Sequence, residues 1–157
     1  PAQDVPATAA TVVRDPVEGR GPLQGIAVGL SALQNLTAYA FVCATDAPFL
    51  CPVFIQHLHA HCVAGGHDAA VVREGRHLQS LAAIYRTSLA RRAKQLLADD
   101  RQRPAFLFEA ADTLELTPAE LLSDGTLRRA DPELLSLHNI NTQAQYEAAR
   151  LRLDVAD

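Results

Sequence analysis

Residues 38–45, AYAFVCAT, form a largely apolar run that leads directly into a carboxylate, Asp46. Continuous apolar runs of this length are typical of strands that are buried on both faces, as in sheets covered by helices on each side. The carboxyl ends of such strands are where open α/β sheets bind their ligands. The run therefore predicts an α/β fold, and it makes Asp46 either a turn-forming residue or part of a site.

Strand-like and helix-like segments alternate along the rest of the chain. The patterns predict strands at 10–13, 38–45, 68–72, 79–85, 113–116 and 134–140. Helices are predicted at 23–34, from Pro52 to the Gly65–Gly66 pair, from Thr87 or Ser88 to Leu97, at 104–111, and within 117–122 and 141–153. This alternation predicts an α/β class with a mainly parallel sheet, and a length of 157 residues suits a single domain.

Two glycines, Gly25 and Gly29, lie within the helix predicted at 23–34. A glycine inside a helix is unfavourable by about 1 kcal/mol relative to alanine. Their presence predicts that another backbone or a ligand approaches this helix closely.

The composition excludes some classes of protein. The formal net charge is −4, whereas nucleic-acid-binding proteins usually carry a basic excess, so we expect no nucleic-acid partner. No apolar run approaches the roughly 20 residues that span a bilayer, and the chain starts without a basic-then-apolar leader, so we expect no membrane partner. The cysteines Cys43, Cys51 and Cys62 lie in apolar or helical segments, which favours buried thiols and a cytoplasmic location.

Three of the predicted strands end in short polar side chains: Asp15, Asp46, and Asn139 with Asn141. In a parallel sheet these ends share one edge, so the side chains are expected to converge. A carboxylate with nearby amide oxygens is the ligand set that Mg²⁺ prefers. Aspartate and asparagine also cap helices and form tight turns, so for each residue taken alone a purely structural role remains the alternative.

The segment GRGPLQG, residues 19–25, opens a predicted helix. Its free backbone N–H groups suit an anion or the polar edge of a base, and Arg20 and Arg76 add positive charge. The sequence contains no G-x-S-x-G element, no P-loop and no dinucleotide-binding fingerprint. His57 and His61 are four residues apart on one predicted helix face, which suits either a transition-metal pair or a solvated surface, and no further ligands accompany them.

Three segments together resemble, in order and spacing, the molybdenum cofactor guanylyltransferases of the nucleotidyltransferase superfamily. These segments are VVRDPVEGRGPLQGIAVGLSAL (12–33), FVCATDAPFL (41–50) and LHNINTQAQYEAA (137–149). The resemblance extends over nearly the whole chain. It implies a Rossmann-like, three-layer α/β/α fold and the transfer of GMP from GTP to molybdopterin, with Mg²⁺ as cofactor and release of pyrophosphate.

The resemblance also implies roles for individual residues. Asp46 would be catalytic, holding the metal that bridges the GTP phosphates. The nucleotide site would further include Asp15 and the loop Gly21, Pro22 and Leu23. The pterin substrate would contact Arg76, Gln79, Asn139 and Asn141. GTP and molybdopterin are thus the expected partners, and other cofactor-biosynthesis proteins or the apo-molybdoenzymes are further candidates.

One feature departs from the family pattern. Family members begin with a strand and a loop of the type L-A-G-G-x-S-x-R-M-G, followed by a lysine, which cradle the triphosphate. This sequence starts after that region, and its only lysine is Lys94. We therefore expect the chain to be a truncated or partly observed form, in which the edge of a neighbouring strand is left unpaired. The alternative is a protein that has lost the phosphate loop and does not catalyse the reaction.

Two other functions remain as alternatives. The first is a molybdenum cofactor cytidylyltransferase, or another sugar or pterin nucleotidyltransferase; the segment N-I-N-T at 139–142 favours the guanylyl enzyme, because the sister family tends to have D-I-D-T. The second is a non-catalytic module that binds the pterin or a partner protein.

Overall fold

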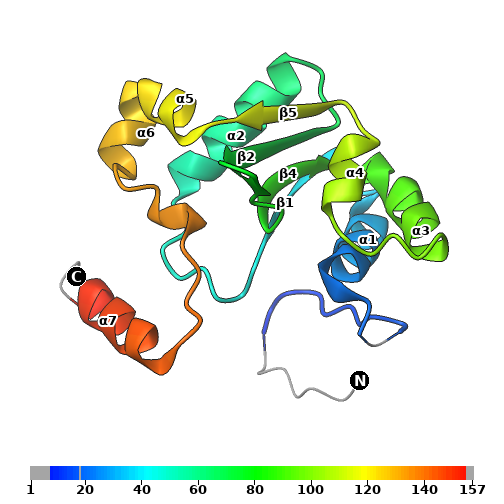
Figure 1. Ribbon diagram of the computed structural model, residues 1–157, viewed down its shortest axis with the longest axis horizontal. Coiled ribbons are helices and arrows are strands. Elements are labelled where there is room, and N and C mark those ends of the chain that lie inside the picture. Colours follow the sequence, from blue (N-terminus) through cyan, green and yellow to red (C-terminus); the bar gives the residue numbers. More distant parts are fainter. Residues whose placement is uncertain (1–7, 18, 155–157) are drawn as a thin grey trace.

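The computed structural model describes residues 8–17 and 19–154 and shows one mixed sheet with helices on both faces (Figure 1). The strands are β1 (Tyr39–Cys43), β2 (Ala69–Glu74), β3 (His77–Leu78), β4 (Ala82–Arg86) and β5 (Thr113–Leu116). The helices are α1 (Gly21–Leu33), α2 (Pro52–Ala64), α3 (Ala90–Ala98), α4 (Ala105–Glu109), α5 (Pro118–Ser123), α6 (Gly125–Ala130) and α7 (Gln143–Asp154), with 3₁₀ turns at Thr87–Leu89 and Leu135–Leu137. No helix in this part of the chain is both long and apolar enough to cross a bilayer.

The α/β class predicted from the sequence is confirmed, but the sheet is mixed rather than mainly parallel. The strand β4 lies between β1 and β2 and runs antiparallel to both, while β5 is parallel to β2. The reversal begins at Gly75, whose φ of +59° suits glycine, and the short β2–β3 hairpin returns the chain directly beside β2. A parallel return would need a crossover of a dozen or more residues, which this segment lacks.

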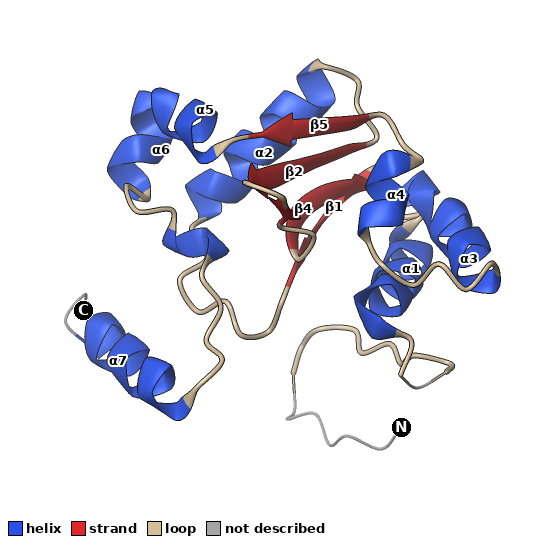
Figure 2. Ribbon diagram, in the orientation of Figure 1, coloured by secondary structure: helices blue, strands red, loops and turns tan. Residues whose placement is uncertain are grey.

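Both faces of the sheet are covered by helices (Figure 2). Along β2 the side chains alternate, with Ala69 and Val71 packing under α1, α3 and α4, and Ala70 and Val72 packing under α2, α5 and α6. All four are fully buried. The need to bury both faces explains why this strand is an unbroken apolar run in the sequence.

Two predicted strands do not form. Residues 10–13 have no regular structure, and Val12 and Val13 stay about half exposed, at 48% and 47%. Residues 134–140 contain a 3₁₀ turn instead, because the carboxylate of Asp131 accepts hydrogen bonds from the backbone N–H groups of Leu135 (2.7 Å) and Ser136 (3.1 Å). A strand would require those N–H groups for a neighbouring chain.

The strand β1 is an edge strand and is less buried than predicted. Among the described residues it pairs only with β4, and its residues are half-buried up to Cys43, which is exposed. Within the described residues, β1 therefore has one unpaired edge.

The expectation that another backbone approaches Gly25 and Gly29 closely is wrong, and the approach of a ligand stays a prediction. No atom outside the helix's own backbone lies within 4 Å of the position that a Cβ would take at either glycine. An alanine would therefore fit at both positions and would also restrict the unfolded chain.

We predict that Gly25→Ala and Gly29→Ala each raise the free energy of unfolding by about 0.5–1 kcal/mol, measured by urea denaturation. Gly21→Ala is the matched control in the same helix. It should lower stability, because Gly21 has a φ of +67°. A loss of stability in Gly25→Ala or Gly29→Ala would show that this helix face is in contact with something.

Candidate functional site

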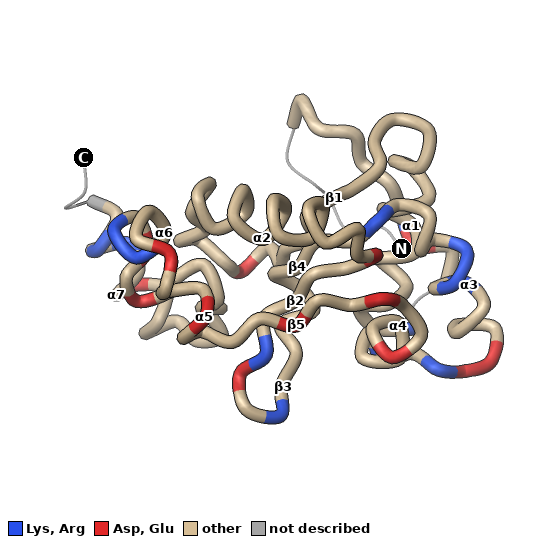
Figure 3. Tube along the Cα trace, turned by 90° about the horizontal axis from the view of Figure 1, so that it is seen from above, with Lys and Arg blue, Asp and Glu red and all other residues tan. Residues whose placement is uncertain are grey.

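The carboxyl ends of β1 and β2 lie at the same edge of the sheet. Since β4 is antiparallel to both of these strands, they run in the same direction. Asp46 follows β1, and the hairpin that contains Arg76 follows β2. Figure 3 shows that this hairpin extends away from the sheet and that charged residues gather on it.

Asp46 has a carboxylate oxygen that lacks a partner. Its Oδ1 is buried and accepts no hydrogen bond from the described residues. A buried carboxylate oxygen without a partner is costly unless a cation or a donor arrives. This atom therefore fits a bound divalent ion.

The described residues contain no group of three or more His, Cys, Asp or Glu side chains that could hold a metal ion. An ion held at Asp46 would thus need water and the oxygen atoms of a bound substrate as further ligands. This arrangement is the usual one for Mg²⁺, which keeps several waters and binds through one or two carboxylates plus phosphates.

The structure brings Asn139 and Asn141 to the loop that holds Asp46. The N–H of Ile140, which lies between them, donates to the backbone carbonyl of Asp46 at 2.8 Å. Both asparagine side chains are exposed. Asn141 also has a structural role, because its N–H donates to Oε1 of Gln145 (2.8 Å) in the capping arrangement that starts α7.

The nucleotide loop predicted from the sequence lies at the start of α1. Gly21 and Pro22 are exposed, and α1 starts without a side-chain cap and without an acidic residue in its first turn, so its backbone N–H groups are available to an anion. Leu23 differs, because its side chain is fully buried in the core and only its backbone can face a ligand. Asp15 is exposed, and no described hydrogen bond or ion pair connects it with Asp46.

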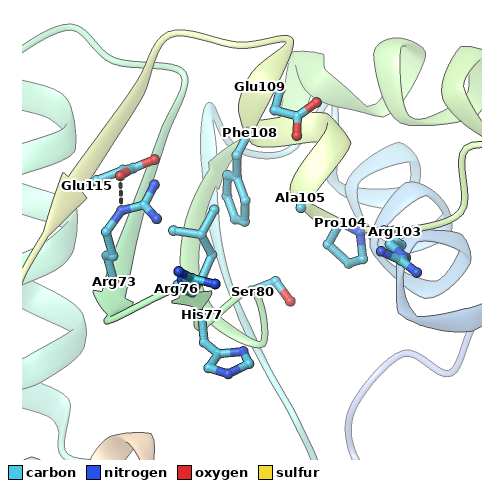
Figure 4. A pocket seen from close by; sticks show the side chains of 11 residues that line it. Arg73, Arg76, His77, Ser80, Arg103, Pro104, Ala105, Phe108, Glu109 and Glu115 are labelled. Atoms are coloured by element: carbon cyan, nitrogen blue, oxygen red, sulfur yellow. Dashed lines mark hydrogen bonds and ion pairs between the residues drawn. The ribbon is translucent and has the colours of Figure 1, made fainter.

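Arg76 and Gln79, both expected to contact the pterin, have different surroundings in the structure. Gln79 donates its side-chain amide to Glu74 and its N–H to the carbonyl of Val72 (2.9 Å), which stabilises the hairpin. Arg76 lines a pocket of about 520 Å³ between the hairpin and α4 (Figure 4). The pocket also contains residues that the sequence analysis missed, among them Arg73, Ser80, Arg103 and Phe108.

His57 and His61 are neighbours on α2, with ring centroids 4.3 Å apart, and Nδ1 of His61 lies 3.0 Å from the carbonyl oxygen of His57. Burial lowers the pKa of His57, and the nearby His61 lowers it further, whereas Asp124 raises it. Burial and the neighbouring His61 together therefore favour the neutral imidazole at His57.

Comparison with known proteins places the chain among nucleotidyltransferases. The sequence pattern of the MobA-like NTP transferase domain matches residues 1–114. A protein of Mycobacterium avium (strain 104) named "Probable molybdenum cofactor guanylyltransferase" is 33% identical over 149 residues, which are 94% of this chain and 68% of that protein. A protein of the same name from Mycobacterium tuberculosis (strain H37Rv) is 34% identical over 121 residues, or 76% of this chain and 60% of the relative.

Solved structures agree with this relationship. The crystal structure of molybdopterin-guanine dinucleotide biosynthesis protein A from Archaeoglobus fulgidus matches with a TM-score of 0.69 and 25% identity, over 85% of this chain and 63% of that one. A protein from Aquifex aeolicus shares the fold, with a TM-score of 0.64 and 19% identity. The chain thus spans between 60% and 68% of the length of these relatives.

We predict that acidification destabilises the protein through His57. Because the folded state holds the pKa of His57 below its ordinary value of about 6.5, the stabilisation is complete above that pH and is lost as the pH falls towards the lowered pKa. The difference in the free energy of unfolding between pH 7.5 and pH 5.5, measured by urea denaturation, should be smaller in His57→Gln than in the parent protein. His61→Gln should retain part of the dependence, because burial is the larger cause; an unchanged dependence in His57→Gln would contradict the assignment.

Proposed function

The chain belongs to the MobA-like NTP transferase family, and we propose that it transfers GMP from GTP to molybdopterin, forming the guanine dinucleotide form of the molybdenum cofactor. The names of its relatives support this substrate pair. The observation on which the proposal rests is the unpaired, buried Oδ1 of Asp46 at the carboxyl edge of the sheet. The relatives are longer than this chain, so the proposal concerns the activity of the whole protein.

The proposed reaction is a single phosphoryl substitution. An oxygen of the acceptor's phosphate attacks the α-phosphorus of GTP and forms the new P–O bond. The bond from the α-phosphorus to the oxygen bridging to the β-phosphate breaks, and pyrophosphate leaves with that electron pair. The protein has to position the two phosphates and stabilise charge, and no covalent nucleophile is needed.

Asp46 is proposed to hold a divalent ion. Enzymes of this family generally use a divalent metal, and we propose Mg²⁺ because a single carboxylate with phosphates and water suits it. When bound, the ion supplies positive charge to the phosphates. Asp46 would hold the ion in a fixed position, because the N–H of Ile140 donates a hydrogen bond to the backbone carbonyl of Asp46.

We propose that some of the remaining site residues contact the nucleotide and the others contact the pterin. The start of α1, at Gly21 and Pro22 and the backbone of Leu23, is proposed to contact the guanosine, with Asp15 nearby. Asn139 and Asn141 lie beside the Asp46 loop, where they can donate side-chain N–H groups to phosphate oxygens. Arg76 and Gln79 are proposed to face the pterin, and of these Arg76 has the more accessible side chain.

We also propose that residues 1–157 form a single nucleotidyltransferase-like domain located in the cytoplasm. The two helical layers packed on one sheet support the first point. Cys43, Cys51 and Cys62 are free thiols, which supports a reducing compartment.

We predict that Asp46→Asn weakens the binding of Mg-GTP about ten-fold or more and abolishes Mg²⁺-dependent GMP transfer, because the amide removes the negative charge at the ion. Calorimetric titration of GTP with and without Mg²⁺ measures the first effect, and the formation of pyrophosphate measures the second.

The matched control is Asp112→Asn. Asp112 directly precedes β5, which is parallel to β2, so it lies at the opposite edge of the sheet. This variant should bind and react like the parent protein. Full activity in Asp46→Asn would remove the basis of the metal assignment.

A further inference from the structure

We propose that the pocket between the β2–β3 hairpin and α4 binds an anionic group of the acceptor substrate through Arg76 and Arg103. This inference rests on the proposed function for the identity of the ligand, while the chemistry of the pocket is independent of it. Arg76 comes from the hairpin and Arg103 from the segment just before α4 (Figure 4).

The charges of the pocket are not balanced by its own residues. The pocket contains two carboxylates, and both have basic partners: Glu115 pairs with Arg73, and Glu109 pairs with Arg101 at 3.2 Å. Within residues 8–17 and 19–154, neither Arg76 nor Arg103 forms an ion pair or a side-chain hydrogen bond. The pocket thus has two available guanidinium groups, although the chain as a whole has a net charge of −4.

Two guanidinium groups on separate walls suit an oxyanion. The planar fork of arginine matches the oxygens of a phosphate and can bind them in pairs. Beside the arginines, the apolar side chains of Leu78, Pro104 and Ala105 line the same pocket. They offer a surface for the ring system to which the anionic group is attached.

Tyr85 connects two residues that line the pocket, Ser80 and Phe108. Its fully buried hydroxyl donates to the carbonyl of Ser80 at 2.8 Å, and its ring stacks on Phe108, with centroids 5.4 Å apart and planes at 20°. Burial raises the pKa of Tyr85, so the hydroxyl remains a donor. Because one side chain contacts the hairpin side and α4 together, the pocket is formed before a ligand arrives, which lowers the entropic cost of binding.

The pocket also adjoins the loop proposed for the nucleotide. A Cβ at Gly21 would lie 4.0 Å from the carbonyl oxygen of Gln102, the residue before Arg103. The side chain of Arg20 lies 3.9 Å from that of Asp100 in the same segment. A ligand held by Arg103 would therefore be close to the start of α1, as an acceptor must be to its nucleotide.

The test uses 4-methylumbelliferyl phosphate as a probe, since it joins a flat ring to a phosphate, and 4-methylumbelliferone as the matched probe without the anion. Fluorescence titration of the 157-residue chain should show binding of the phosphate ester and much weaker binding of the phenol in its neutral form. Arg76→Gln and Arg103→Gln should each weaken phosphate binding about ten-fold or more. Arg128→Gln, at an exposed arginine of α6 on the other face of the sheet, should leave it unchanged.

Two further variants test whether the probe binds in this pocket and not at Asp46. Asp46→Asn should keep probe binding, whereas Tyr85→Phe, which retains the ring but not the hydroxyl, should weaken it several-fold. Equal binding by Arg103→Gln and the parent, or loss of binding in Asp46→Asn alone, would overturn the proposal. Intact probe binding without GMP transfer in the full-length protein would count against the proposed function and leave the anion site standing.

Discussion

The strand β2 is buried on both faces and paired along both edges, and the other elements take their positions from it. Ala69, Ala70, Val71 and Val72 are fully buried between the two helical layers. Burying a valine side chain stabilises a fold by about 1.5–3 kcal/mol, so a polar substitution here would disturb both layers. The turn at Gly75 then directs the chain back along the same strand, which places β4 antiparallel at the centre of the sheet.

This topology places Asp46 and the β2–β3 hairpin at the same edge of the sheet. With β4 between them, β1 and β2 run in one direction and send Asp46 and the hairpin to a common edge. The Ile140–Asp46 hydrogen bond adds the asparagine segment from much later in the chain. The buried Oδ1 of Asp46, which has no partner among the described residues, thus belongs to a loop that is joined to the segment of Asn139 and Asn141, and this supports the proposed metal-assisted transfer.

Local electrostatics differ from the overall charge of the protein. Both carboxylates that line the pocket form ion pairs, Glu115 with Arg73 and Glu109 with Arg101, whereas Arg76 and Arg103 form no ion pair within the described residues. The same pairs connect β5 with β2 and α4 with the segment before it, and they leave the charges of Arg76 and Arg103 uncompensated. Tyr85 adds a neutral, buried connection that does not depend on pH in the physiological range.

Local patterns in the sequence determined the α/β class, the strand that precedes Asp46, and the capping boxes of Thr117 with Glu120 and Thr142 with Gln145, because each depends on neighbours within a few residues. The strand predicted at 134–140 failed because Asp131 satisfies the backbone there, and the one predicted at 10–13 has no partner strand. Only the tertiary structure decided that Arg103 and Arg76 line one pocket and that Oδ1 of Asp46 is buried without a partner among the described residues. Both facts arise from contacts between segments distant in sequence, which no local pattern records.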